Sequence, residues 1–120
     1  MLVVEDDAPL RELYRSALRT FGYAVVAVED GLEALRRVER TPPDAVVLDL
    51  ALPRLSGRDV HRELKAHPET HDIPVIVVSG TDISDLNPND FACVLKKPIS
   101  VDALIQAVQD CIRRHRWPKS

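Results

Sequence analysis

Short runs of apolar residues alternate along this chain with longer segments in which apolar residues recur at helical spacing. The apolar runs predict five β-strands, namely Leu2–Val4, Tyr23–Val28, Ala45–Asp49, Pro74–Ser79 and Ala92–Leu95. The third and fourth runs are almost continuously apolar, which is typical of parallel strands buried on both faces. Strands that alternate with helices in this way indicate an α/β fold, a doubly wound sheet with helices on each side.

Four helices are predicted between and after the strands, and their end signals are recognisable. The first has Pro9 in its first turn and Gly22 after its last. Asp30 caps the second, the third spans Arg58–Ala66, and Ser100 caps the closing helix. The apolar positions expected to face the sheet are Leu10, Leu13, Tyr14, Ala17, Leu18 and Phe21 in the first helix, Leu32, Leu35 and Val38 in the second, Val60 and Leu64 in the third, and Val101, Leu104, Ile105, Val108 and Ile112 in the last.

The bulk composition is that of one ordinary globular domain. The chain has 120 residues, of which 45% are hydrophobic and 29% are charged. We assign residues 1–114 to the folded domain and residues 115–120 to a tail or the start of a linker. Cys93 and Cys111 are far apart and fit no metal or redox spacing, so we expect two reduced thiols in the core.

Charge and hydropathy argue against two classes of function. Lys plus Arg number 16 against 19 Asp plus Glu, a net charge of −3, whereas a nucleic-acid surface usually shows a basic excess. The basic run Arg113–Arg116 is explained by a helix end, where cations are favourable. The start of the chain is acidic, unlike a signal peptide, and no apolar run reaches membrane-spanning length. We therefore expect a cytoplasmic domain that binds neither nucleic acid directly nor a membrane.

Polar side chains follow four of the predicted strands at their carboxyl ends. In chain order they are Glu5 and Asp6, Asp49, Ser79, and Lys96 and Lys97 followed by Pro98. The carboxyl ends of the strands in a doubly wound sheet form one edge, and ligands bind there. Each of these residues alone has a simpler explanation, such as a helix cap or a turn. Their coincidence at this carboxyl edge is what indicates a functional site.

The chemistry of this set is that of phosphoryl transfer. Clustered carboxylates raise one another's pKa, and a hard divalent cation relieves the repulsion. An all-oxygen ligand set without His or Cys suits Mg²⁺. A hydroxyl from Ser79 and an ammonium from a lysine stabilise the oxygens of a transferring phosphoryl group. Asp49, which we expect to be exposed where its strand emerges, is the candidate nucleophile.

The chain resembles the receiver domain of the two-component response-regulator family. The likeness covers essentially all 120 residues and rests on four motifs taken together: LVVEDD at the start, DLALPRLSG in the middle, PVIVVSG, and KKP. The resemblance implies a flavodoxin-like, five-stranded parallel sheet with the strand order 2-1-3-4-5. It also implies a phosphoacceptor that works in two-component signal transduction.

The resemblance implies a metal site built around the phosphoacceptor. Asp49 would accept the phosphoryl group, and Glu5 and Asp6 would be the acidic pair that holds Mg²⁺. Asp49 itself and the backbone carbonyl of Ala51 would complete the metal ligands. Asp7 competes with Glu5 for a place in the acidic pair, but the register of the motif favours Glu5.

The resemblance also assigns the groups that contact the phosphoryl oxygens. Ser79 would bind the phosphoryl group, and Gly80 after it would leave room for the group to enter. Lys97, which directly precedes Pro98, would be the family's lysine, with a cis peptide bond between the two. Lys96 is the rival, but the family's lysine stands immediately before proline.

Two features depart from the family pattern. The switch residue three positions before the lysine is usually Tyr or Phe, and here it is Val94. The interval from Ser79 to Lys97 is several residues shorter than usual, and its segment TDISDLNPND has little helical periodicity and contains Pro88. We therefore expect the fourth helix of the family to be shortened or absent. Many family members dimerise or signal through the face formed by that helix with the last strand and helix, and we expect this domain not to use that face in the common way.

The resemblance implies a partner but no particular pathway. A histidine kinase or a histidine phosphotransfer protein would supply the phosphoryl group, and the domain is either a single-domain regulator or fused in cis to a kinase or output domain. It would be a signalling phosphoacceptor rather than an enzyme, since it would catalyse only its own phosphorylation and dephosphorylation. The lifetime of the aspartyl phosphate would depend on nearby side chains such as Ala51 and Thr81.

Three other functions compare less well with the residues. A phosphatase of the dehalogenase type needs a second Asp two positions after the first, where this chain has Ala51, and a flavin-binding module needs a phosphate loop where this chain has three acidic residues. A degenerate receiver that acts as a phosphorylation-independent protein-interaction module remains the alternative. Val94 and the short segment favour it, whereas the intact set of acidic, hydroxyl and ammonium groups opposes it. The four histidines, expected to be solvated surface residues, are His61, His67, His71 and His115.

Overall fold

The computed structural model describes residues 1–116. Its elements in chain order are β1 Leu2–Val4, α1 Ala8–Thr20, β2 Val26–Val28, α2 Gly31–Arg40, β3 Val46–Leu48, α3 Gly57–Ala66, β4 Val75–Ser79, the 3₁₀ turn η1 Pro88–Asp90, β5 Cys93–Lys96 and α4 Val101–Arg116. The five predicted strands and four predicted helices are present, although β2 begins at Val26 rather than Tyr23. Residues 117–120, most of the predicted tail, lie outside the described residues.

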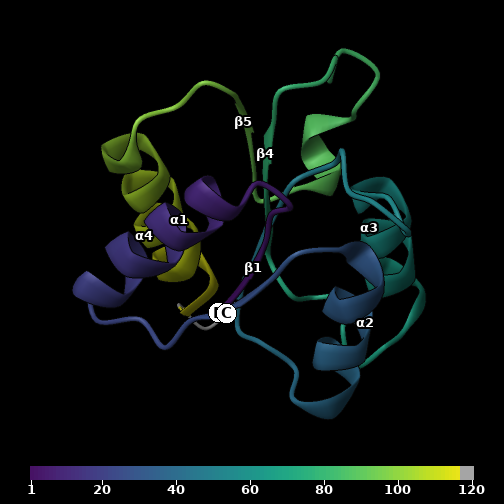
Figure 1. Cartoon of the computed structure of the whole chain (residues 1–120). Coiled ribbons are helices and arrows are strands. Elements are labelled where there is room, and N and C mark those ends of the chain that lie inside the picture. Colours follow the sequence, from purple (N-terminus) through teal and green to yellow (C-terminus); the bar gives the residue numbers. More distant parts are fainter. Residues whose placement is uncertain (117–120) are drawn as a thin grey trace.

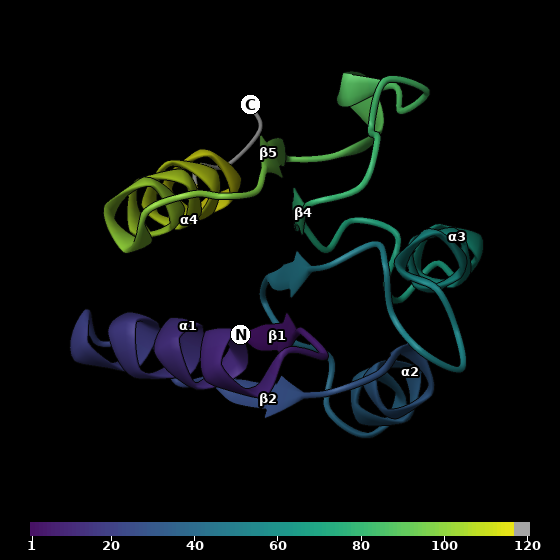
Figure 2. The same cartoon turned by 45° about the horizontal axis from the view of Figure 1, so that its top comes forward.

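The five strands form one parallel sheet in the order β2-β1-β3-β4-β5. Strands β2, β1 and β3 end at the same level, since Val4 of β1 lies opposite Val28 of β2 and Leu48 of β3. Helices α1 and α4 cover one face of the sheet, and α2 and α3 cover the other (Figures 1 and 2). This arrangement confirms the doubly wound topology and the predicted strand order.

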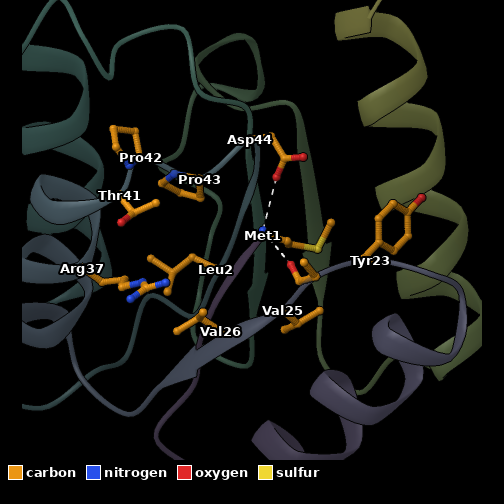
Figure 3. Close-up of a pocket in the computed structure, with 11 residues that line it drawn as sticks. Met1, Leu2, Tyr23, Val25, Val26, Arg37, Thr41, Pro42, Pro43 and Asp44 are labelled. Carbon is orange, nitrogen blue, oxygen red and sulfur yellow. Dashed lines mark hydrogen bonds and ion pairs between the residues drawn. The ribbon is translucent and has the colours of Figure 1, made fainter.

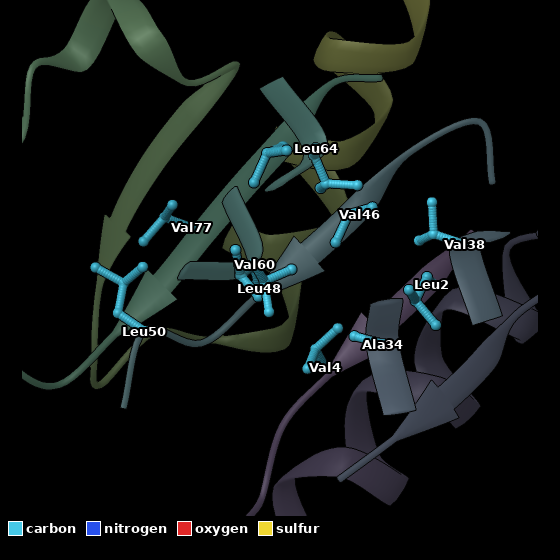
Figure 4. Close-up of a cluster of buried hydrophobic side chains, with 11 residues drawn as sticks. Leu2, Val4, Ala34, Val38, Val46, Leu48, Leu50, Val60, Leu64 and Val77 are labelled. Atoms are coloured by element: carbon cyan, nitrogen blue, oxygen red, sulfur yellow. The ribbon is translucent and has the colours of Figure 1, made fainter. Parts of the chain in front are cut away.

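The core consists of two apolar clusters, one on each face of the sheet. Successive residues of a strand point to opposite faces, so Leu2 and Val4 pack on the side of α2 and α3, while Val3 packs on the side of α1 and α4. Figure 4 shows the first cluster, in which strand residues meet Ala34 of α2 and Val60 of α3. Because both faces are covered, the central strands are apolar at every position except Ser79 at the end of β4, as their continuous runs predict.

Two helix starts are set by the capping residues that the sequence predicts. Asp30 Oδ1 accepts a hydrogen bond of 2.9 Å from the amide of Glu33, and Ser100 Oγ accepts one of 3.0 Å from the amide of Ala103. Each bond satisfies an amide that has no partner inside its own helix.

The predicted inner faces of two helices need correction. In α1, Leu13 and Phe21 are 47% and 56% exposed, because Leu13 lies beside the buried stripe and Phe21 is the C-cap beyond the last helical residue. In α2, Val38 is buried against the sheet as predicted and Ala34 is buried beside it, whereas Leu32 is only half-buried and outside the cluster. Within the described part of the chain, no helix is both long and apolar enough to span a membrane.

The segment between β4 and β5 contains only the 3₁₀ turn η1 where the family has a helix, which confirms the shortened fourth helix. The segment is tied to α3 by two side chains. Arg58 Nη2 donates to Asp85 Oδ1 at 3.1 Å, and His61 Nε2 lies 3.2 Å from the carbonyl oxygen of Asp90. The His61 ring also packs on Phe91, with ring centroids 4.2 Å apart.

The prediction that every histidine is solvated is therefore wrong for His61, which is half-buried between α3 and this segment. Burial lowers its pKa below the ordinary value of 6.5, although the Asp90 carbonyl opposes that shift. His67 and His71 are exposed as expected, and the side chain of His115 lies outside the described residues. Cys93 and Cys111 are reduced thiols in the cluster under α1 and α4, as expected.

Candidate functional site

Three carboxylates meet at the carboxyl edge of the sheet. Glu5 and Asp49 directly follow β1 and β3, and these adjacent parallel strands end in step because Val4 lies opposite Leu48. Together with Asp6, they each bring a carboxylate oxygen within 4.8 Å of the others. Glu5 and Asp49 are only 2% and 5% exposed, whereas Asp6 is exposed. The expectation that Asp49 is exposed is thus wrong, since the surrounding loops and Lys97 cover it.

Lys97 compensates the two buried carboxylates. Its Nζ lies 2.6 Å from Glu5 Oε1 and 3.2 Å from Asp49 Oδ2. The residue directly follows β5, and its amide donates to the carbonyl of Ser79 at 2.8 Å, so the end of β4 positions it. The peptide bond from Lys97 to Pro98 is cis, as the resemblance implies. Lys96, the rival lysine, is the last residue of β5 and is exposed.

Burial and pairing shift the pKa values of this pair upward. Burial raises the pKa of Glu5 from 4.5 to about 7, against the hydrogen bonds from Lys97 and from the amide of Asp7, which lower it. Burial lowers the pKa of Lys97, but its hydrogen bonds to Glu5 and Asp49 and their charges outweigh this, and the pKa lies above 10.5. The lysine therefore stays charged at neutral pH, whereas the pKa of Glu5 itself lies close to neutral pH.

Asp7, the rival of Glu5, has a different task. Its Oδ1 accepts a hydrogen bond of 3.1 Å from the amide of Leu10 and so caps α1. Its own amide donates to Glu5 Oε2 at 3.1 Å, and this hydrogen bond helps to fix the buried carboxylate next to the start of α1. The structure thus gives Asp7 a capping role and leaves the cluster to Glu5, Asp6 and Asp49.

Ser79 presents a hydroxyl at the carboxyl end of β4. It is fully buried, and its Oγ lies 2.8 Å from Thr81 Oγ1 and accepts from the Thr81 amide at 3.2 Å. A Cβ at Gly80 would lie 3.8 Å from Lys97 Cβ, an ordinary contact, so Gly80 borders the lysine closely without a steric requirement for glycine. Val94 packs into the cluster under α2 and α3, and this position therefore offers only aliphatic surface.

The loop after β3 is fixed by a close approach of backbones. Ala51 donates its amide to Asp49 Oδ1 at 3.1 Å, which orients the carboxylate. Gly57 at the start of α3 lies so near Asp49 that a Cβ there would be 2.2 Å from the Asp49 carbonyl oxygen. Only glycine permits this contact, and its amide also donates to the carbonyl of Leu50 at 2.9 Å.

Sequence reasoning missed two arginines that hold the loops of this edge. Arg11 Nη1 donates to the carbonyl oxygens of Glu5 and Asp6 at 2.9 and 3.4 Å, so α1 clamps the acidic pair. An arginine in the first turn of the helix that follows an acidic pair is a sequence signal that could have indicated the role of Arg11. Arg54 pairs with Asp30, 24 residues away, and no local pattern could have indicated that contact.

A hollow of about 430 Å³ lies at the opposite end of the sheet, at the amino ends of the strands (Figure 3). The Met1 amino group lies 3.2 Å from Asp44 Oδ1 and donates to the carbonyl of Ala24 at 2.9 Å. Arg37 of α2 also lines it. None of the residues predicted to act at the carboxyl edge lines this hollow.

The fold and the edge together define a doubly wound α/β protein with an acidic site that also carries a buried hydroxyl and an ammonium. The family model of the response regulator receiver domain matches residues 1–109 of this chain. The chain therefore belongs to the response regulator receiver domain family, whose members act in two-component signalling.

Individual proteins are similar over nearly the whole chain. The response regulator MprA of Mycobacterium leprae (strain TN) is 36% identical over 121 residues, which cover 95% of this chain and 51% of the relative. The signal receiver domain of a signal transduction histidine kinase from Syntrophus aciditrophicus superposes with a TM-score of 0.86 at 27% identity, covering 99% of this chain and 93% of that one. The receiver domain of the Francisella response regulator 1452 gives 0.85 at 26%, covering 96% and 97%. The chain spans about half the length of the curated relatives it matches.

Proposed function

We propose that this domain accepts a phosphoryl group on Asp49 from the phosphohistidine of a histidine kinase or a histidine phosphotransfer protein, and thereby switches its interactions. The observation that carries the proposal is the placement of Asp49. Its buried carboxylate lies beside two further carboxylates and 3.2 Å from the Lys97 ammonium, at the edge where doubly wound sheets bind ligands.

The transfer itself needs only groups that lie at this edge. A carboxylate oxygen of Asp49 attacks phosphorus, a P–O bond forms, and the P–N bond breaks with its electron pair left on the imidazole nitrogen. The Ser79 hydroxyl and the Lys97 ammonium stabilise the charge on the phosphoryl oxygens. Hydrolysis of the acyl phosphate reverses the modification, so the domain acts only on itself and is not an enzyme in the usual sense.

The residues present fit a Mg²⁺ ion. The carboxylates of Glu5, Asp6 and Asp49 form a compact all-oxygen group, and the Ala51 carbonyl lies in the loop directly after Asp49. These four residues would hold the ion, which supplies positive charge against the phosphoryl oxygens when it is bound. Among residues 1–116, Lys97 is the cation paired with these carboxylates, and it contacts two of the three, which leaves a net negative site that attracts a cation.

We further propose that the domain works in the cytoplasm as part of a longer protein. The matched relatives are about twice as long as this chain, and one similar structure is the receiver domain of a histidine kinase. Fusion in cis to an output or kinase domain accounts for both observations. The net charge of −3 supports a role without direct contact of this domain to nucleic acid.

The second candidate is a degenerate receiver that binds partners without phosphorylation. Val94 in place of the switch aromatic and the single 3₁₀ turn between β4 and β5 favour it. The complete set of Asp49, Ser79, Lys97 and the acidic pair favours the phosphoacceptor. The two proposals differ in whether Asp49 becomes modified.

Intact mass decides between them. The chain is incubated with MgCl₂ and a small acyl phosphate, alongside Asp49→Ala and the matched control Asp72→Ala, whose carboxylate is 89% exposed. We expect one added phosphoryl group on the wild type and the control and none on Asp49→Ala. No addition on the wild type, with Mg²⁺ binding demonstrated by calorimetry, would establish the interaction module instead.

A further inference from the structure

The loop between β3 and α3, residues 49–56, is held at its middle by an arginine in an unusual backbone conformation. Arg54 has φ of 65°, and among the residues that the structure describes it is the one non-glycine residue with a positive φ. The left-handed region is unfavourable for an L side chain and persists only where other contacts enforce it. The side-chain contacts of Arg54 therefore account for its backbone conformation.

Arg54 reaches across to the start of α2. Its Nε donates to Asp30 Oδ2 at 3.0 Å, and its Nη2 contacts the same oxygen. The Asp30 side chain is only 3% exposed, and its other oxygen caps α2 through the amide of Glu33. Arg54 thus links the phosphoacceptor loop to a buried carboxylate that is itself fixed by a helix end.

The Arg54–Asp30 ion pair also offsets a local excess of negative charge. Glu29, Asp30 and Glu33 each bring a carboxylate oxygen within 4.8 Å of the others. Like charges at this distance destabilise one another unless a cation lies among them. Arg54 supplies that cation, and the charges of Glu29 and Glu33 add to the attraction that holds its guanidinium.

Backbone contacts leave the loop little room on either side of Arg54. A Cβ at Gly31 would lie 2.1 Å from the carbonyl oxygen of Leu55, and one at Gly57 would lie 2.2 Å from that of Asp49. The start of α2 and the start of α3 therefore both press against the loop. Between these two contacts, the bridge to Asp30 is a polar side-chain tie on the intervening residues, Ala51 among them, and it adds to the packing of Leu52 and Leu55 on the core.

We propose that Arg54 is a positioning residue for the metal site: its bridge to Asp30 holds the β3–α3 loop so that the Ala51 carbonyl and the Asp49 carboxylate are preorganised for Mg²⁺ and for phosphoryl transfer. Arg54 acts through the loop that carries these groups, and its hydrogen bonds go to Asp30. The inference rests on the proposed function for the identity of the ion, and it adds a residue that fixes how tightly the ion binds. Groups that orient metal ligands typically change affinity by an order of magnitude or more when they are removed.

The test is a calorimetric titration of the full chain with MgCl₂. Arg54→Asn removes the guanidinium but keeps a residue that tolerates a positive φ, whereas Arg54→Lys keeps the charge. We expect Arg54→Asn to raise the Kd for Mg²⁺ on the order of 10-fold and to slow phosphorylation by the acyl phosphate, and Arg54→Lys to restore most of both. Arg62→Asn is the matched control, since Arg62 is exposed and pairs with Asp59 on α3, and we expect it to leave both values unchanged.

Two further variants remove ambiguity. Asp30→Ser keeps a helix cap but removes the carboxylate, so it should reproduce the Mg²⁺ Kd of Arg54→Asn. It replaces Arg54→Asn in the test if Arg54→Asn does not fold. Adding Asp6→Ala to Arg54→Asn should abolish the measured heat, which assigns it to the carboxyl edge rather than to the acidic group at α2.

An Arg54→Asn protein with a lowered Tm but an unchanged Mg²⁺ Kd would overturn the positioning role and leave a purely structural one. A wild type that binds Mg²⁺ yet never gains a phosphoryl group would overturn the proposed function. The affinity comparison remains valid in that case, so the two failures are distinguishable.

Discussion

At the scale of single residues, Glu5 shows how burial changes the chemistry of a side chain. Its carboxylate is 2% exposed, and the loss of hydration disfavours the ionised form, so its pKa lies at about 7. The Lys97 ammonium at 2.6 Å only partly offsets that loss. The site therefore holds a carboxyl group whose charge changes near neutral pH when no metal is bound.

Glu5→Gln is expected to stabilise the metal-free domain above pH 7. Because the folded pKa of about 7 exceeds the ordinary 4.5, the stability from the Glu5 proton is fully present below pH 4.5 and is lost as pH rises to about 7. The shift corresponds to roughly 3 kcal/mol between these limits. Thermal unfolding from pH 5 to 8 with a chelator should show a flatter profile and a higher Tm above pH 7 for the variant.

The matched control for this prediction is Glu39→Gln, on the exposed side of α2. It should follow the wild-type profile throughout. A difference between Glu5→Gln and the wild type that does not vary with pH would show that the substitution acts through packing instead.

At the scale of elements, the start of α3 sets the position of the loop that carries Asp49, the proposed phosphoacceptor. Gly57→Ala would place a Cβ 2.2 Å from the Asp49 carbonyl oxygen, so backbone must move. We expect a loss of about 1–3 kcal/mol in the free energy of unfolding, the usual cost of overpacking, together with weaker Mg²⁺ binding. Chemical denaturation and calorimetry measure the two effects.

Gly80→Ala is the matched control for the start of α3, since its Cβ would meet Lys97 at no less than 3.8 Å. Its free energy of unfolding should change little. If Gly57→Ala and Gly80→Ala lower the free energy of unfolding equally, the close approach of α3 to Asp49 does not contribute to stability.

The segment between β4 and β5 depends on its two ties to α3. Its amides bond mainly within local turns, such as Leu86 to Ile83 and Asp90 to Asn87, and most of its residues are exposed. Phe91→Ala removes the ring that packs on His61, and we expect amide exchange of residues 82–91 to rise roughly 10-fold, with β4 unaffected. Ser84→Ala, exposed in the same segment, should leave exchange unchanged, and equal effects of the two variants would contradict the role of the ring.

At the scale of the whole molecule, the Mg²⁺ site proposed at the carboxyl edge would link metal binding to global stability. A ligand that binds only the folded state stabilises it by mass action, about 2.7 kcal/mol at 100 times its Kd. We expect Mg²⁺ to raise the Tm, and to raise it more at pH 8 than at pH 6, because Glu5 must lose its proton to act as a ligand.

Asp6→Ala should abolish this rise, whereas Glu29→Ala, in the acidic group at α2, should preserve it. A melting experiment across a MgCl₂ series checks both variants. An unchanged response of Asp6→Ala would remove Asp6 from the metal site.

The sequence by itself determined the alternation of strands and helices and the composition of the carboxyl edge, and the resemblance to receivers supplied the strand order. Apolar runs such as Ala45–Leu48 and caps such as Asp30 are local signals, because strand burial and helix ends depend on residues close in the chain. Alternation of strand and helix then places the residues after each strand at one edge. The resemblance to receivers added the role of each of these residues.

Only the tertiary structure decided how those groups act on one another. Lys97 contacts Glu5 across 92 positions and Arg54 contacts Asp30 across 24, and no local pattern encodes such distances. The burial of Asp49 and the exposure of Phe21 likewise depend on which elements lie above the sheet and where each one ends. Local propensity specifies the elements, whereas desolvation and long-range pairing, which set the pKa of Glu5 and the charge balance of the site, exist only once the chain has packed.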